Sequence, residues 1–210
     1  MAPRKYEMSR RRLTIDATRS RILAAARSLI GGSKDLDDFT IDSVAEKAGV
    51  SRMTVFNQFK SRAGLLDALA DHLAARGGMV RPRDAFTTTD PGKAIDAFVR
   101  TFVHFWASDR ITMRRLRAMG VVFPSQAGKP RARDQWRSEH LAVLLERFQL
   151  PTGARKRDRE DVLSTLTWLT AFETFDSLCT ARRTPAQVAS LLSRLAREQV
   201  GLEPQSRRIG

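Results

Sequence analysis

Basic, amide and hydroxyl side chains gather in the segment TIDSVAEKAGVSRMTVFNQFKSRAGLL, residues 40–66. Thr40 is a good N-cap, because its hydroxyl can accept a hydrogen bond from a first-turn amide, and apolar residues follow it at helical spacing. Gly49 suits the positive φ at which helices often end, and Ser51 can cap a second helix. The segment therefore predicts two short helices around a tight turn, which is the helix-turn-helix pattern.

The second of these helices is predicted to point Val55, Phe56 and Phe59 inward and to leave a polar, basic face outside. A helix of this size fits the major groove of DNA. The side chains predicted outside are Arg52, Met53, Thr54, Asn57 and Gln58.

Each exposed side chain has a chemistry that suits DNA. Arg52 can pair with guanine O6 and N7, Met53 can pack on a thymine methyl, and Asn57 can pair with adenine. The side chains better placed to contact phosphates, which fix the register without reading sequence, are Thr40, Ser51, Thr54, Gln58, Lys60 and Arg62. The alternative for every one of them is a solvated helix surface.

The composition indicates a polyanionic partner. The chain has 210 residues and a formal net charge of +14, which favours nucleic acid first and an anionic membrane surface second. Cys179 is the single cysteine, so no intrachain disulfide can form and a reducing cytoplasm is expected. No apolar run is long enough for a membrane span, so no membrane partner is predicted.

The apolar periodicity divides the chain into an all-α protein with two domains. We expect a basic flexible arm at residues 1–15, a DNA-binding domain with a connecting helix at 16–76, a linker at 77–92, a helical bundle at 93–204 and a tail at 205–210. The DNA-binding domain is expected to start with a helix at residues 16–30, and the connecting helix at 62–76 is expected to have Leu65, Leu66, Leu69 and Leu73 on its inward side. The arm could follow the DNA backbone or enter the minor groove, but a solvated tail that raises nonspecific affinity is the favoured interpretation.

Within the bundle, helices are predicted at residues 93–108, 110–122, 131–148, 158–181 and from Thr184-Pro185 onward, with a loop at 122–130 and a break at 151–157. The helix at 158–181 is apolar nearly all round, so both of its sides need a partner.

The run AGVSRMTVFNQFKSRAGLL, preceded by TRSRILAAARSLI and FTIDSVAEK, resembles the N-terminal DNA-binding domain of the TetR family of transcriptional regulators over residues 18–69. Family members usually have Tyr where this chain has Phe56 and Lys where it has Arg62. Arg62 keeps the charge for a phosphate contact, whereas Phe56 lacks a hydroxyl and its ring is instead placed to touch a thymine methyl.

The resemblance implies that the last two helices meet their copies across a two-fold axis as a four-helix dimer interface. A helix central to its own bundle is the alternative for residues 158–181. The resemblance also implies a small-molecule site in the C-terminal domain, between helices lined by aromatic residues with a few polar anchors.

The residues predicted to line that site are Phe98, Thr101, Phe102, Phe105, Met113, Met119, Trp136, Trp168, Phe172, Glu173 and Asp176. An aromatic stripe at helical spacing more often only fills a core. Glu173 and Asp176, three residues apart, would favour a cationic or hydroxylated ligand if they face inward, and capping or interface pairing is equally open.

Catalysis has little support in the sequence. His72, His104 and His140 are scattered without metal-ligand spacing, Cys179 has no nearby histidine in the sequence, and no phosphate-binding glycine motif is present. We therefore expect no enzyme, cofactor or metal. The sequence predicts a homodimeric regulator of a palindromic double-stranded DNA operator, most often a repressor released by a small effector. A constitutive or architectural DNA-binding protein without an effector is the alternative, and an activator differs only in where its site lies.

Overall fold

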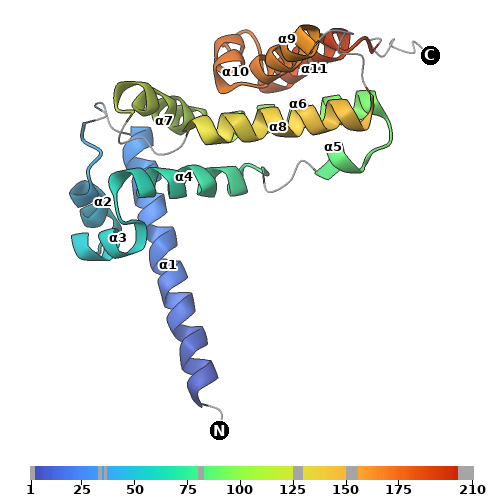
Figure 1. Ribbon diagram of the computed structural model, residues 1–210. Helices are drawn as coiled ribbons and strands as arrows, with labels where there is room; N and C mark the ends of the chain where they lie inside the picture. The colour runs from blue at the N-terminus through green and yellow to red at the C-terminus, as the bar shows by residue number, and fades with distance from the viewer. Residues whose placement is uncertain are drawn as a thin grey trace. The chain divides into compact units, whose positions relative to one another are not determined.

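A computed structural model describes residues 3–32, 35, 37–79, 83–124, 130–149 and 156–202 of the chain. Over these ranges the secondary structure is helical, without a strand, and the predicted all-α fold is confirmed (Figure 1). The helices are α1 (Pro3–Gly32), α2 (Ile41–Ala48), α3 (Arg52–Phe59), α4 (Arg62–Arg76), α5 (Arg83–Thr87), α6 (Pro91–Ser108), α7 (Arg110–Val122), α8 (Pro130–Arg147), α9 (Lys156–Leu169), α10 (Phe172–Leu178) and α11 (Pro185–Gln199).

The chain forms two compact units. The N-terminal unit comprises Met1–Leu73 and Arg114–Gly128, and the C-terminal unit comprises Ala74–Met113 and Lys129–Gly210. The boundary therefore falls within α4 and within α7. The sequence had assigned all of α7 to the C-terminal domain, and its periodicity could not show that residues 114–122 pack with the N-terminal unit. That the DNA-binding domain ends at Arg76 and the ligand-binding domain begins after the linker stays a prediction.

The core of the N-terminal unit comes from one apolar stripe on each of its helices. In α1 the side chains of Ile22, Ala26 and Ile30 are buried at i, i+4 and i+8. α1 packs against α2, and α2 packs against α3 (Figure 1). The four leucines predicted to face inward from α4 are all buried, namely Leu65, Leu66, Leu69 and Leu73.

The start of α1 differs from the expectation. We expected a helix from Asp16 after a flexible arm, but α1 begins at Pro3. Residues 3–15 have no apolar periodicity, so the pattern gave no reason to expect a helix there. Arg, Lys, Glu and Met are good helix formers, and extending an existing helix is easier than nucleating a new one.

In the C-terminal unit, α6 packs against α5, α10 and α11, while α9 packs against α8 and α11. α6 starts at Pro91 because the Asp90 side chain accepts a hydrogen bond from the Lys93 amide at 2.8 Å. α11 starts at Pro185, as predicted, with Thr184 and Gln187 forming a capping box. Cys179 lies buried in the same unit.

The predicted single helix over residues 158–181 is wrong, because it breaks between α9 and α10 at Thr170 and Ala171. The Thr170 hydroxyl donates to the Leu166 carbonyl at 2.9 Å, and the Thr170 carbonyl accepts from Trp106 Nε1 at 3.0 Å. The Thr174 hydroxyl donates to the Trp168 carbonyl at 2.6 Å. These bonds satisfy the backbone at the break, so the helix can end in a buried place.

The predicted linker at 77–92 contains the short helix α5. The predicted loop at 122–130 and break at 151–157 lie mostly outside the described residues, and the tail at 205–210 lies wholly outside them. No helix of the described ranges is both long enough and apolar enough to cross a bilayer.

Candidate nucleic-acid interface

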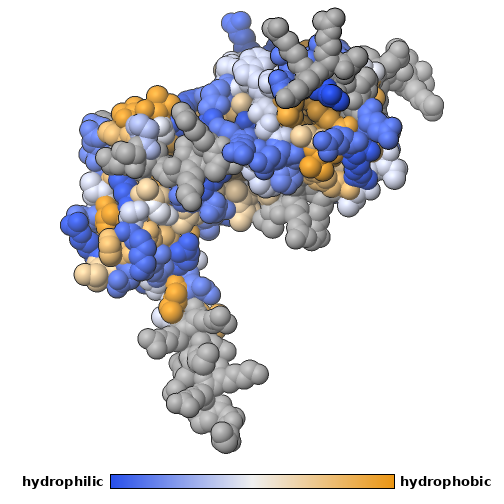
Figure 2. Space-filling view, viewed as in Figure 1, coloured by the Kyte–Doolittle hydropathy of each residue, from blue (hydrophilic) through white to orange (hydrophobic). Residues whose placement is uncertain are grey.

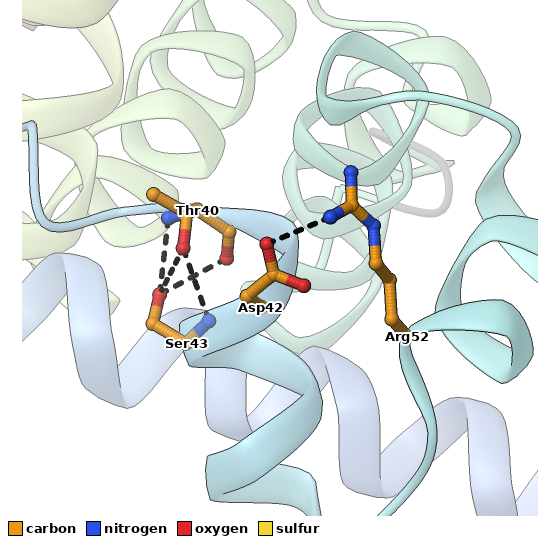
Figure 3. A network of polar contacts seen from close by, with 4 residues as sticks. All are labelled: Thr40, Asp42, Ser43 and Arg52. Atoms are coloured by element: carbon orange, nitrogen blue, oxygen red, sulfur yellow. Dashed lines mark hydrogen bonds and ion pairs between the residues drawn. The ribbon is translucent and has the colours of Figure 1, made fainter.

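The start of α2 is fixed by two reciprocal hydrogen bonds. The Thr40 hydroxyl accepts from the Ser43 amide, and the Ser43 hydroxyl accepts from the Thr40 amide, both at 3.0 Å (Figure 3). The Ser43 hydroxyl also lies 2.9 Å from the Asp38 carbonyl. Thr40, predicted to contact phosphate, is exposed while it holds this capping box.

The turn between α2 and α3 depends on Gly49. Its φ of 63° and ψ of 42° lie in the left-handed region, and its amide donates to the carbonyls of Ala45 and Glu46. The Val50 amide donates to the Ala45 carbonyl at 3.0 Å. The helix-turn-helix predicted from the sequence is thus present, with the predicted caps on both sides of the turn.

The helix α3 begins at Ser51, whose hydroxyl accepts from the Thr54 amide at 3.1 Å and lies 2.8 Å from the Thr54 hydroxyl. Only Val55 and Phe59 of α3 are buried. The prediction that Phe56 points inward is wrong, since its side chain is 51% exposed. A helix this short offers one inward stripe at i and i+4, and Phe56 lies about 100° round the helix from Val55.

The outward face of α3 carries the side chains expected to read bases. Arg52, Met53 and Asn57 are exposed, Met53 by 64%, and Thr54 and Gln58 are half-buried. Figure 2 shows hydrophilic residues interspersed with hydrophobic ones over this part of the surface. Such a face offers hydrogen-bond donors beside apolar contacts, which is the mixture that base edges in the major groove require.

Arg52 has a partner in the structure that the sequence did not suggest. Its Nη1 lies 3.1 Å from Oδ2 of Asp42, and the two side chains are 72% and 62% exposed (Figure 3). Asp42 lies in the first turn of α2, ten residues earlier in the chain. The pair therefore joins the two helices of the motif on their exposed side.

The two basic residues after α3 lie in different surroundings. Lys60 is exposed and ends the helix at a φ of 65°. Arg62 is half-buried, with its guanidinium carbon 5.6 Å from the Phe39 ring centre and 5.3 Å from that of Phe123. Burial lowers the pKa of Arg62, and the Asp37 carboxylate acts in the opposite direction. The side chain stays charged, because arginine is not deprotonated in proteins.

Two arginines from α1 and α7 make further contacts within the N-terminal unit. The Arg19 guanidinium of α1 lies 4.6 Å from the Phe59 ring centre, and Arg115 of α7 donates to the Ile30 carbonyl at 2.6 Å. The second bond satisfies a carbonyl in the last turn of α1, which a helix leaves without an internal donor.

Several of the aromatic residues predicted to line a ligand site pack against other rings. In the C-terminal unit, ring centres lie 4.9 Å apart for Phe98 and Phe102, 4.4 Å for Phe105 and Trp106, and 5.6 Å for Trp106 and Phe172. All of these rings are buried. Contacts of this kind are typical of a filled aromatic core.

The other predicted ligand residues are dispersed. Trp168 is 63% exposed, and Glu173 is exposed on α10. The half-buried Thr101 donates to the Ala97 carbonyl at 2.8 Å, while Asp176 is paired with Arg110. Met113 is buried in the C-terminal unit and Met119 in the N-terminal unit, and Trp136 stacks 3.8 Å from His140.

An open groove of about 440 Å³ lies elsewhere in the C-terminal unit, where the sequence gave no signal. Its lining residues are Asp84, Thr88, Lys93, Asp96, Ala97 and Arg100. Asp96 is buried and pairs with Arg197 at 3.3 Å and with Arg100 at 3.6 Å. Among the described residues, no group of three or more His, Cys, Asp and Glu side chains is arranged to hold a metal.

The capped helices, the left-handed glycine turn and the exposed face of α3 define a helix-turn-helix protein. Residues 22–69 match the family model described as bacterial regulatory proteins, tetR family. Over these residues the chain is therefore similar to the DNA-binding domain of that family.

Two named relatives extend this match. Over 89 residues, 42% of this chain, it is 36% identical to the HTH-type transcriptional regulator AlkX of Mycobacterium tuberculosis. That alignment spans 41% of the relative's length. Over 137 residues, 65% of this chain and 72% of the other, it is 27% identical to the uncharacterized HTH-type transcriptional regulator YvkB of Bacillus subtilis.

Solved structures show that the fold is shared over most of the chain. A crystal structure described as that of a TetR-family transcriptional regulator from Rhodococcus sp. has a TM-score of 0.68 at 22% identity, over 88% of this chain and 98% of the other. A second regulator, from Rhodococcus sp. Rha1, has a TM-score of 0.66 at 17% identity, over 89% of this chain and 99% of the other.

Proposed function

We propose that the chain is a homodimeric transcriptional regulator that inserts α3 of each copy into the major groove of a roughly palindromic operator. The observation that supports this most directly is the outward face of α3, where Arg52, Met53 and Asn57 are exposed and Val55 and Phe59 hold the helix in place. The net charge of +14 adds a sequence-independent attraction to DNA phosphates.

The dimer is proposed because a single helix-turn-helix reads only a half-site, and two copies one helical turn apart read a palindrome. We propose the last two helical segments, α9–α10 and α11, as the interface. Trp168, 63% exposed on α9, supports this placement, since a large exposed apolar side chain commonly marks a contact surface. Sedimentation of the wild-type chain and of Trp168→Glu tests it, with a weaker dimer expected for the variant.

We further propose that the regulator is a repressor that a small effector releases from DNA. The effector would bind one arrangement of the protein better than the other, and that difference in affinity shifts the population. Phe98, Phe102 and Phe172 are buried, and the first two rings lie 4.9 Å apart, so a ligand between those two rings would have to separate them.

A DNA selection followed by competition tests the proposal. The full chain is incubated with random-sequence duplexes, and the enriched sequence then competes with unrelated duplex at two salt concentrations. A regulator enriches one palindromic sequence and prefers it at both concentrations, whereas a charge-driven binder shows no preference and loses affinity steeply with salt. Absence of an enriched sequence would contradict the proposal.

The second candidate is a constitutive DNA-binding protein without an effector. The ring packing of the C-terminal core supports this candidate, because several of the residues predicted to bind a ligand contact other rings. A screen of small molecules for release of the selected DNA separates the two functions, since release by any of them excludes the constitutive protein.

A further inference from the structure

A carboxylate on the reading side of a strongly basic protein needs an explanation. Asp42 is exposed beside Arg52, and a carboxylate there repels DNA phosphates. The pair adds little to the stability of the fold, because exposed ion pairs contribute little to the free energy of unfolding. The effect of Asp42 on Arg52 therefore explains the pair better than stability does.

Helix caps fix the backbone at both residues of the ion pair. Asp42 lies in the first turn of α2, which the Thr40 and Ser43 capping box fixes, and Arg52 is the first residue of α3, which Ser51 caps (Figure 3). The Nη1 to Oδ2 distance of 3.1 Å thus joins two fixed points, and it restricts where the guanidinium can lie.

The bond leaves most of the guanidinium available. Asp42 binds only Nη1, and among the described residues Arg52 has no other hydrogen bond or ion pair. A guanidinium carries five N–H donors in a planar fork, so its remaining edge can still donate two parallel bonds. Two parallel acceptors are what guanine presents in the major groove through O6 and N7.

We propose that Asp42 is a positioning residue that holds the Arg52 guanidinium edge-on to the major groove, so that Arg52 reads a guanine there and does not settle on a neighbouring phosphate. This rests on the proposed function. It names one feature of the DNA that the protein recognises, a G·C pair in each half-site facing the start of α3.

The experiment starts from the duplex selected by the wild-type chain. Each G·C pair of the half-site is replaced in turn by A·T, and the affinity of each duplex is measured together with that of an unrelated duplex. The variants are Asp42→Asn, Asp42→Glu, Arg52→Ala and Arg52→Lys. The matched control is Glu46→Gln, because Glu46 is exposed one turn further along α2 and its side chain has no partner among the residues described.

Wild type is expected to lose affinity about 5- to 150-fold at one G·C pair, the range of a good bidentate contact. Asp42→Asn and Arg52→Ala lose that discrimination. Glu46→Gln also removes one negative charge, but this variant keeps the discrimination. Asp42→Glu retains most of it, because the longer carboxylate can still pair, whereas Arg52→Lys loses it, because an ammonium has no fork.

The outcomes separate this inference from the proposed function. If no sequence is enriched, the proposed function fails and the inference fails with it. If a sequence is enriched but Asp42→Asn discriminates as wild type does, or Glu46→Gln loses discrimination equally, only the inference is overturned. Thermal unfolding of each variant checks the fold, and Arg52→Lys repeats the test with Asp42 intact.

Discussion

Replacing Gly92 by alanine should break an ion pair between α6 and α11. A Cβ on Gly92 would lie 2.9 Å from both Cζ and Nη2 of Arg197 and 3.0 Å from its Nη1. The guanidinium must therefore shift, and we expect the shift to lengthen its contact with Asp96, whose Oδ2 it meets at 3.3 Å. Both charged side chains are nearly buried, Arg197 being 13% exposed and Asp96 12% exposed.

The size of the effect follows from two opposed contributions. Separating a buried pair costs about 3–5 kcal/mol when one partner is lost. Arg100, 68% exposed and 3.6 Å from the same Asp96 oxygen, keeps part of that interaction, so we expect about 2–3 kcal/mol here. Alanine is favoured over glycine inside a helix by up to about 1 kcal/mol. The net expectation for Gly92→Ala is a loss of about 1–3 kcal/mol of unfolding free energy.

Urea unfolding followed by tryptophan fluorescence measures this loss. The chain has three tryptophans, Trp106, Trp136 and Trp168, and all lie in the C-terminal unit with the perturbed pair. The control is the same substitution in an Arg197→Met background, where no guanidinium is left to displace. There Gly92→Ala should be neutral or stabilising. Equal destabilisation in both backgrounds would refute the reasoning.

Three further substitutions test single features of the chain. Thr40→Ala removes the cap of α2 and should lower the unfolding free energy by about 1 kcal/mol in thermal unfolding, whereas Thr40→Ser should be nearly silent. Trp106→Phe leaves the buried Thr170 carbonyl without its donor and should cost about 1–3 kcal/mol in urea, so an unchanged midpoint would contradict that bond's role. Arg52→Ala should weaken operator binding by about 1–3 kcal/mol in a titration and spare unrelated duplex. Equal losses on both duplexes would place Arg52 among the phosphate contacts.

Local signals in the sequence were sufficient to predict the helix-turn-helix. Thr40, Gly49 and Ser51 act within a few residues of themselves, through a hydroxyl cap or a left-handed backbone, and the structure has each of them in the predicted role. Helix periodicity likewise placed the buried leucines of α4. Such features depend on neighbours in the chain, which a sequence displays directly.

Features that depend on distant residues were missed. The end of α9 at Thr170 is stabilised by a hydrogen bond from Trp106, 64 residues away in the chain. Apolar residues continue across this break, so the sequence does not indicate it. The Asp42 and Arg52 pair also depends on how two helices cross. The aromatic side chains of the C-terminal unit were recognised, but which of them contact one another depends on how the helices pack.

The burial of Cys179 bears on how this protein can be labelled. It is the single cysteine, and its side chain is only 7% exposed. A thiol shielded in this way reacts slowly with alkylating probes, since reaction needs an accessible thiolate. A cysteine introduced at the exposed position of Asn57 could then carry a dye alone, and the native chain would serve as its own unlabelled background.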